Sequence, residues 1–151
     1  MTQDSIEREV TIEAPVERVW SVITEAEHVG RWFCDDGAEI DLKPGGEMVM
    51  RWAEHGVGRA RIVDVDPPHR FSYRWAAIRE HWGEEPDESN STLVEFMLAE
   101  DGGGTRLRVV ESGFEKLDGT DDQRREAFEG NTEGWEVQLG NVAKYSERVT
   151  A

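Results

Sequence analysis

The chain has 151 residues, of which 37% are hydrophobic, and its formal net charge at pH 7 is −16. This acidity excludes the positive surface that nucleic acids and anionic membranes require, so neither is expected as a partner. Cys34 is the only cysteine, which excludes an intrachain disulfide and a cysteine-based zinc site.

Length and hydropathy favour a single domain over residues 1–151 and a cytoplasmic location. The start of the chain, MTQDSIEREV, has neither the basic nor the apolar region of a secretory signal. No run of about 18 apolar residues is present, so no membrane span is expected. The excess of acidic residues is interpreted as a solvated shell, with an acidic docking surface as the alternative.

The first thirty residues predict one strand followed by two short helices. The stretch IEREVTIEAP alternates apolar and acidic side chains, as a half-buried strand does. Pro15 then stands at the favoured first-turn position of a helix, PVERVWSVIT, whose apolar residues recur at helical spacing. A second short helix is expected near Ala26–Trp32, before the sequence WFCDDG breaks the pattern.

Between residues 38 and 112, alternating apolar and polar residues predict six antiparallel strands. Clusters of glycine, proline and aspartate separate them, including the turns Pro44-Gly45-Gly46 and Asp101-Gly102-Gly103-Gly104. The polar segment Arg79–Ser91 predicts a long loop. The predicted strands are Ala38–Leu42, Glu47–Ala53, Val57–Val65, and the runs around Phe71–Ala76, Thr92–Ala99 and Thr105–Glu111.

The last thirty residues predict one long helix from about Asp121. Its apolar residues form a single stripe, so one face should be buried. Because an antiparallel meander buries one face and this helix alone is long enough to cover it, the pattern predicts an α+β fold with the helix across a curved sheet. The residues of the stripe are Phe128, Trp135, Leu139, Val142, Tyr145 and Val149.

Two glycines, Gly130 and Gly134, lie four residues apart beside Trp135 in this helix, and Gly140 follows. A glycine inside a helix costs about 1 kcal/mol relative to alanine. Close seating of the helix on the sheet, plain helix weakness, and room for a ligand all account for Gly130 and Gly134, and the sequence leaves these alternatives open.

Six phrases in this order resemble the START-like helix-grip superfamily, also called SRPBCC or birch-pollen-allergen-like, and within it the AHSA-type group. They are EREVTIEAPVERVWSVIT, HVGRWF, KPGGEMVMRW, VDVDPPHRFSYRW, VVESGF and GWEVQLGNVAKY. The resemblance implies a curved antiparallel sheet wrapped around a long C-terminal helix, two short helices after the first strand, and a cavity between helix and sheet. It implies no catalytic motif, because members bind lipids, sterols, polyketides, hormones or protein partners, and some are cyclases or hydrolases.

Strand parity indicates which side chains face the helix, and many of them are aromatic. A mostly apolar cavity with a few polar anchors is typical of ligand sites. For each residue taken alone, a place in the ordinary core is the alternative. The predicted ligand-binding residues are Trp32, Phe33, Met50, Trp52, Tyr73, Trp75, Phe96, Val109, Glu111, Phe114, Asn131, Trp135, Gln138 and Leu139.

Glu111 is a weak candidate for a catalytic residue. It alternates in step with Leu107 and Val109 along its strand, so its side chain could point towards the core. If it is buried, its pKa should rise and it becomes an acid or a hydrogen-bond donor. A carboxylate in water at the rim of the sheet is the alternative. Arg59 or Arg61 could face the cavity and pair with Glu111, or both could face solvent, and the sequence does not decide between these faces.

No metal and no cofactor are expected. The four histidines lack the spacing of a metal pair, and Asp35-Asp36 is interpreted as a polar turn. Cys34 has no base near it in the sequence, and the chain contains no nucleophile elbow, P-loop or dinucleotide fingerprint.

Three functions follow from these patterns. The first is a non-enzymatic protein with an enclosed apolar cavity for a hydrophobic ligand, either lipid-like or aromatic. The second, implied by the AHSA-type resemblance, is a regulator that contacts a chaperone ATPase or another protein. Because we expect a single domain, the additional domain of the full co-chaperone is expected to be missing. The third is an enzyme on a hydrophobic carbonyl or aromatic substrate, with Glu111 as acid or base. A monomer and a homodimer both fit the sequence.

Overall fold

The computed structural model describes residues 4–148, which form a curved antiparallel sheet and three α-helices. Seven strands follow the order β1-β7-β6-β5-β4-β3-β2, so β2 to β7 form a meander and β1 closes its edge. Their bounds are β1 (Ser5–Ile12), β2 (Ala38–Ile40), β3 (Glu47–Trp52), β4 (Gly56–Asp66), β5 (Arg70–Ala76), β6 (Ser91–Asp101) and β7 (Gly104–Ser112).

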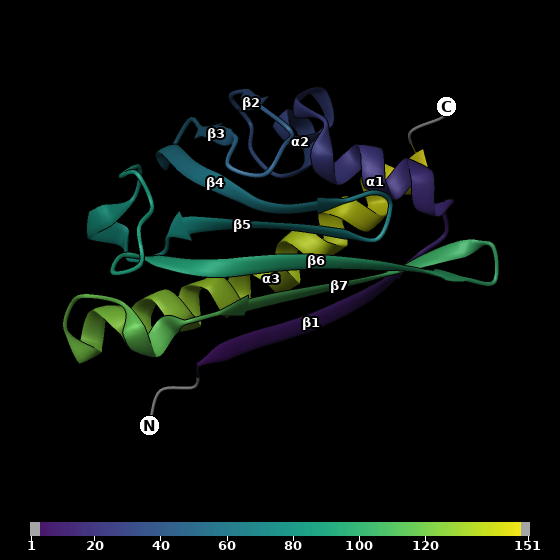
Figure 1. Ribbon diagram of the computed structural model, residues 1–151. Coiled ribbons are helices and arrows are strands. Elements are labelled where there is room, and N and C mark those ends of the chain that lie inside the picture. Colours follow the sequence, from purple (N-terminus) through teal and green to yellow (C-terminus); the bar gives the residue numbers. More distant parts are fainter. Residues whose placement is uncertain (1–3, 149–151) are drawn as a thin grey trace.

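The helices cover one face of this sheet. α3 (Asp121–Arg148) runs across it, and α1 (Val16–Thr24) and α2 (Ala26–Trp32) lie beside the C-terminal half of α3 (Figure 1). Trp135, Leu139 and Val142 of α3 are buried, in agreement with the predicted stripe. Val149, the last residue of that stripe, lies outside the described residues. Over residues 4–148, no helix has the length and hydropathy needed to cross a bilayer.

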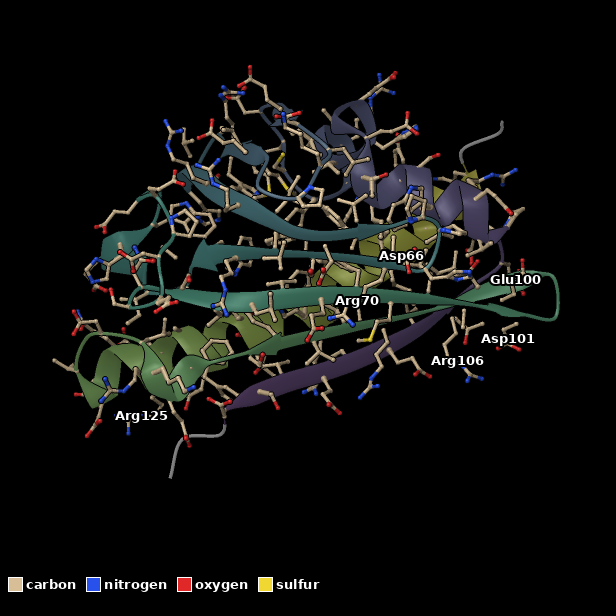
Figure 2. The ribbon with its side chains drawn as sticks, in the orientation of Figure 1. Asp66, Arg70, Glu100, Asp101, Arg106 and Arg125 are labelled. Carbon is tan, nitrogen blue, oxygen red and sulfur yellow. The ribbon has the colours of Figure 1, made fainter. Side chains whose placement is uncertain are left out.

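The period-two pattern of the strands places charged side chains on the opposite face. Glu7 of β1 pairs with Arg108 of β7, where the side-chain nitrogen and oxygen are 3.0 Å apart. In the hairpin between β6 and β7, Arg106 and Asp101 approach to 3.4 Å (Figure 2). Such exposed pairs contribute at most about 1 kcal/mol, so burial of the inner face accounts for most of the stability of the fold.

The predicted α+β helix-grip fold is confirmed, and the differences from prediction are local. β2 ends at Ile40 rather than at Leu42, because the backbone N–H of Lys43 already bonds back to the carbonyl of Asp41. The long polar loop after β5 contains a short 3₁₀ turn, Arg79–His81. This loop is held beside the start of α3 by a bond of 2.7 Å from the backbone N–H of Asp118 to the carbonyl of Ser89.

Candidate functional site

The Glu111 carboxylate is completely buried between the sheet and α3, with 0% of the residue exposed. Four neutral side chains donate hydrogen bonds to it. Oε1 accepts from Trp135 Nε1 at 2.8 Å, and Oε2 accepts from Thr92 Oγ1 at 2.6 Å and from Trp75 Nε1 at 2.9 Å. Asn131 Nδ2 lies 3.0 Å from both oxygens. The alternative of a carboxylate in water at the rim does not hold.

Strand register and helix spacing assemble this site. Trp75 of β5 is paired with Thr92 of β6, so their side chains share the inner face. Glu111 of β7 is paired with Val94, two residues along β6 from Thr92, which places it on that face too. Asn131 and Trp135 are four residues apart and therefore lie on one side of α3. The carboxylate thus ties α3 to three neighbouring strands.

Burial raises the pKa of Glu111 above its ordinary value of 4.5, although the hydrogen bonds from Thr92, Trp75, Trp135 and Asn131 act in the opposite direction. Burial also raises the pKa of Tyr73 well above its usual range, and the nearby negative charge of Glu111 adds to this effect. Among residues 4–148 no basic side chain forms an ion pair with Glu111. The site is therefore a buried acidic group held only by neutral dipoles.

Mild acidification should stabilise the protein relative to a Glu111→Gln variant. A pKa that is higher in the folded state means that the native protein binds the proton more tightly, so this stabilisation is fully present below the unfolded pKa and is lost as the pH rises through the folded pKa. Unfolding free energies of both proteins, measured between about pH 7 and about pH 4.5, should diverge in favour of the native sequence towards low pH. Parallel curves, or divergence in the opposite direction, would show that the pKa of Glu111 is not raised.

Seven aromatic side chains pack against one another in a group that includes Trp75 and Trp135, the two indoles bonded to the carboxylate; we call them the ring cluster. Phe33, Trp75 and Trp135 form its centre, with ring centroids 5.8 to 6.0 Å apart. Such offset-stacked and edge-to-face contacts each add about 0.5–1.5 kcal/mol beyond the area they bury. The members of the ring cluster are Phe33, Trp52, Tyr73, Trp75, Trp82, Phe96 and Trp135.

The structure brings together most of the residues predicted to bind a ligand. Six members of the ring cluster were among the predicted ligand-binding residues, as were Glu111 and Asn131. Gln138, also predicted, donates a long hydrogen bond of 3.4 Å to the carbonyl of Phe33. Met50, Val109 and Leu139 belong to the core around them. Phe114 instead packs on Phe128 near the start of α3. The binding role of all these residues stays a prediction.

The structure decides one question that the sequence left open and differs from the sequence-based picture of the site in two respects. Of the two faces open to Arg59 and Arg61, both residues lie on the outer face of β4, where they pair with Glu47 and Glu85. Trp82 is absent from the predicted ligand-binding residues, because its polar loop has no apolar periodicity. The only sign of burial in the sequence is that a tryptophan stands in such a polar segment. Beneath α3, where the sequence predicts a cavity, the structure shows rings packed on one another.

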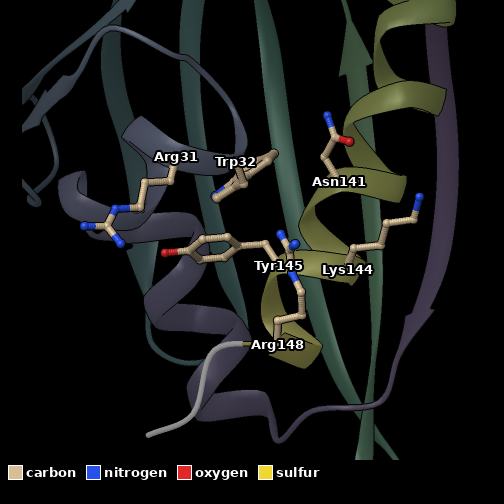
Figure 3. Close-up of a pocket in the computed structure, with 6 residues that line it drawn as sticks. All are labelled: Arg31, Trp32, Asn141, Lys144, Tyr145 and Arg148. Carbon is tan, nitrogen blue, oxygen red and sulfur yellow. The ribbon is translucent and has the colours of Figure 1, made fainter.

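A hollow of about 240 Å³ does exist, but it lies between α2 and the C-terminal half of α3 (Figure 3). Of the predicted ligand-binding residues only Trp32 lines it. The ring of Trp32 stacks on Phe33 at 4.9 Å, so this hollow adjoins the ring cluster without being part of it.

Gly130 and Gly134 are not explained by close packing, because a Cβ atom built on either residue meets no other atom within 4 Å. We therefore expect Gly130→Ala and Gly134→Ala each to raise the free energy of unfolding by about 0.5–1 kcal/mol through better helix propensity. Urea unfolding of each variant measures this, with Glu133→Ala on the exposed side of the same helix as the control. A loss of stability in the glycine variants would mean that α3 needs a bare backbone at these positions.

Comparison with known proteins places this geometry in a family. The family model described as Activator of Hsp90 ATPase homolog 1-like protein matches residues 13–147. No functionally curated protein matches the sequence. Three solved structures share the fold. CalU16 from Micromonospora echinospora is 24% identical, with a TM-score of 0.70 over 95% of this chain and 76% of that chain. The Aha1 dimer from Colwellia psychrerythraea is 17% identical, with a TM-score of 0.76 over 99% of this chain and 100% of that chain. DynU16 of the dynemicin biosynthetic locus is 21% identical, with a TM-score of 0.74 over 97% of this chain and 48% of that chain.

Proposed function

Because the chain belongs to the Activator of Hsp90 ATPase homolog 1-like family, and because its fold gathers rings beneath α3, we propose that it binds a small, flat, apolar molecule within the ring cluster. The observation that carries this proposal is the position of Trp82. This residue comes from the loop between β5 and β6, and its ring fills the end of the cluster. A ligand ring of similar size takes the place of this indole.

The side chain of Trp82 is held in the cluster by packing alone among the described residues. Its ring centroid lies 5.4 Å from those of both Trp52 and Trp75. Gly58 of β4 makes room for it, because a Cβ atom there would lie 2.6 Å from Trp82 Cζ2. The indole N–H of Trp82 is buried and has no hydrogen-bond partner among the described residues. An indole that forms no hydrogen bond is the member of the cluster that an external ring replaces at the lowest cost.

The polar groups of the site favour a ligand that carries one acceptor oxygen. The hydroxyl of Tyr73 is buried and unpartnered in the described part of the chain, and its raised pKa keeps it protonated as a donor. A carbonyl oxygen on the ligand would accept a hydrogen bond from this hydroxyl. A buried donor left without a partner costs about 1–3 kcal/mol of stability. Apolar contact adds about 25 cal/mol for each Å² removed from water.

Glu111 supports binding rather than catalysis in this proposal. A carboxylate offers about four lone-pair sites, and here all of them are engaged by the four donors. Such a group is poorly placed to exchange a proton with a substrate, because a general base needs a free lone pair within reach of the reacting atom. Its role is to hold the Trp75 and Trp135 rings in fixed positions as walls of the site.

Calorimetric titration with 2-acetylnaphthalene tests the proposal, with 2-ethylnaphthalene as a partner of the same shape that lacks the oxygen. The native protein should bind the ketone more tightly, and Tyr73→Phe should remove that preference. Trp82→Ala should bind both compounds at least about tenfold more tightly, because no protein ring has to leave first. Trp20→Ala, which changes a tryptophan outside the cluster, should bind like the native protein. No heat of binding in either the native protein or Trp82→Ala would overturn the proposal.

The family description favours a second candidate, which is regulation of a chaperone ATPase through the surface of this acidic chain. Adding the protein to an Hsp90-type chaperone and measuring ATP hydrolysis tests it directly. A raised ATPase rate together with retention of the chaperone in a pull-down would support this candidate. An unchanged rate and no retention would dismiss it.

The Colwellia protein was solved as a dimer. A monomer and a homodimer both remain predictions for this chain, and analytical ultracentrifugation distinguishes them.

A further inference from the structure

The hollow between α2 and α3 is separate from the ring cluster and has a different chemistry. It is lined by Arg31, Trp32, Asn141, Lys144, Tyr145 and Arg148. Its volume of about 240 Å³ corresponds to roughly eight water molecules at liquid density, or to one ring with a small substituent. Figure 3 shows the Trp32 ring of α2 near the Tyr145 ring of α3, with the end of Arg148 beside Tyr145 and the Arg31 side chain pointing away from them.

Positive charge is concentrated at this hollow in a chain whose net charge is −16. Three of its six lining residues are basic. Arg31 has only Glu27, at 3.8 Å and largely in water, whereas Lys144 and Arg148 pair with no carboxylate of residues 4–148. Arg31 and Arg148 lie in the last turns of α2 and α3, where basic residues offset the helix dipole, but the dipole does not require both of them to line one hollow.

Glu147, the acidic residue next to Arg148 on the last turn of α3, forms a hydrogen bond with another part of the chain. Glu147 Oε2 accepts a hydrogen bond of 2.9 Å from the backbone N–H of Glu13. This bond holds the carboxylate on the side of the start of α1, so it does not neutralise Arg148. The charge at the hollow is therefore available to an anion from solution.

Both aromatic walls of the hollow are fixed in place. Trp32 Nε1 donates to the carbonyl of Val22 at 2.7 Å, which locks the buried indole. The hydroxyl of Tyr145 lies 2.6 Å from Nδ1 of His28, and their rings meet edge to face at 5.5 Å. Two walls that are already ordered lower the entropy cost of binding a flat molecule against them.

We propose that this hollow binds a small aromatic carboxylate. The ring of the ligand packs on Trp32 and Tyr145, and the carboxylate is held by Arg148, with the Asn141 amide, the Lys144 ammonium and the Arg31 guanidinium at the edges of the hollow. Guanidinium groups suit this role, because their planar N–H pairs match the two oxygens of a carboxylate. The proposal does not depend on a ligand in the ring cluster.

Chemical shifts of backbone amides and indole N–H groups, recorded during titration with benzoate at fixed ionic strength, test the proposal. Benzoate should cause saturable shifts at Trp32 and along residues 141–148. Benzamide, which has the same shape without the charge, should bind at least about tenfold more weakly, as should benzoate to an Arg31→Gln/Arg148→Gln double variant. The control is Lys116→Gln/Arg125→Gln, which removes the same charge near the other end of α3.

Several outcomes would overturn this inference. Shifts that do not saturate, or that lie outside the hollow, would exclude a site there. Equal binding of benzamide would exclude recognition of the charge, and tighter binding of inorganic phosphate would exclude recognition of the ring. An equal loss in the control variant would mean that general attraction of anions, rather than the basic residues of this hollow, explains the binding.

Discussion

Replacing Glu111 with leucine should lower the free energy of unfolding by about 3 kcal/mol, even though it removes a buried charge. The carboxylate satisfies two indole N–H groups, one hydroxyl and one amide. Thr92 can rotate its hydroxyl, and half-buried Asn131 can reach water, but the indoles of Trp75 and Trp135 are fixed. Each buried donor without a partner costs about 1–3 kcal/mol, so these two account for most of the loss.

Urea unfolding measures this change, with Glu7→Gln on the outer face of β1 as the control. Glu7 contributes to an exposed ion pair with Arg108, so its substitution should change stability by less than about 1 kcal/mol. An apolar group in place of a buried charge sometimes stabilises a protein. Unchanged or increased stability in Glu111→Leu would mean that the desolvation of the carboxylate outweighs its hydrogen bonds, and that it does not tie α3 to the sheet.

Trp135→Ala should be the other most damaging substitution, with a loss of about 4 kcal/mol. Trp135 is buried, packs on Phe33, Trp75 and Phe96, and donates to Glu111. Alanine leaves a cavity between helix and sheet and takes one donor from the carboxylate.

A Trp135→Phe variant separates the contribution of the ring from that of the indole N–H. It keeps a ring in the cluster but has no N–H, so the loss should be about 1–2 kcal/mol. Val137→Ala, two residues away with 61% of the valine exposed, is the control and should change stability by less than about 0.5 kcal/mol. A loss in Trp135→Ala no larger than that of the control would show that α3 does not depend on this residue.

Parity along β7 groups Glu111 with Leu107 and Val109, so the sequence offered an inward position, but a carboxylate in water at the rim remained the alternative. Its partners were only partly predictable. Trp75, Thr92 and Glu111 come from three strands, and their meeting depends on the register between β5, β6 and β7, which no local pattern specifies. Asn131 was a candidate only because it is four residues from Trp135 on a predicted helix.

Two further features could not be predicted from the sequence, each for a specific physical reason. Arg59 and Arg61 share the outward parity of Val57 on β4, but nothing local shows which face of that strand is buried, and the register of β4 against β5 shifts between Ile62 and Asp64. Trp82 lies in a loop, where position depends on contacts with distant residues such as Gly58. The sequence therefore predicted the layers of the fold and most of the rings, but not the residue that closes the cluster.

Fluorine NMR of protein labelled with 5-fluorotryptophan tests the proposed ligand site most directly, because each of the six tryptophans gives its own signal. Signals are assigned by replacing each tryptophan with phenylalanine in turn. Titration with 2-acetylnaphthalene should shift Trp82 most, and Trp52, Trp75 and Trp135 as well, while Trp20 outside the cluster stays unchanged. Shifts confined to Trp20, or no saturable shift at any tryptophan, would contradict the claim that the ring cluster opens to admit a ligand.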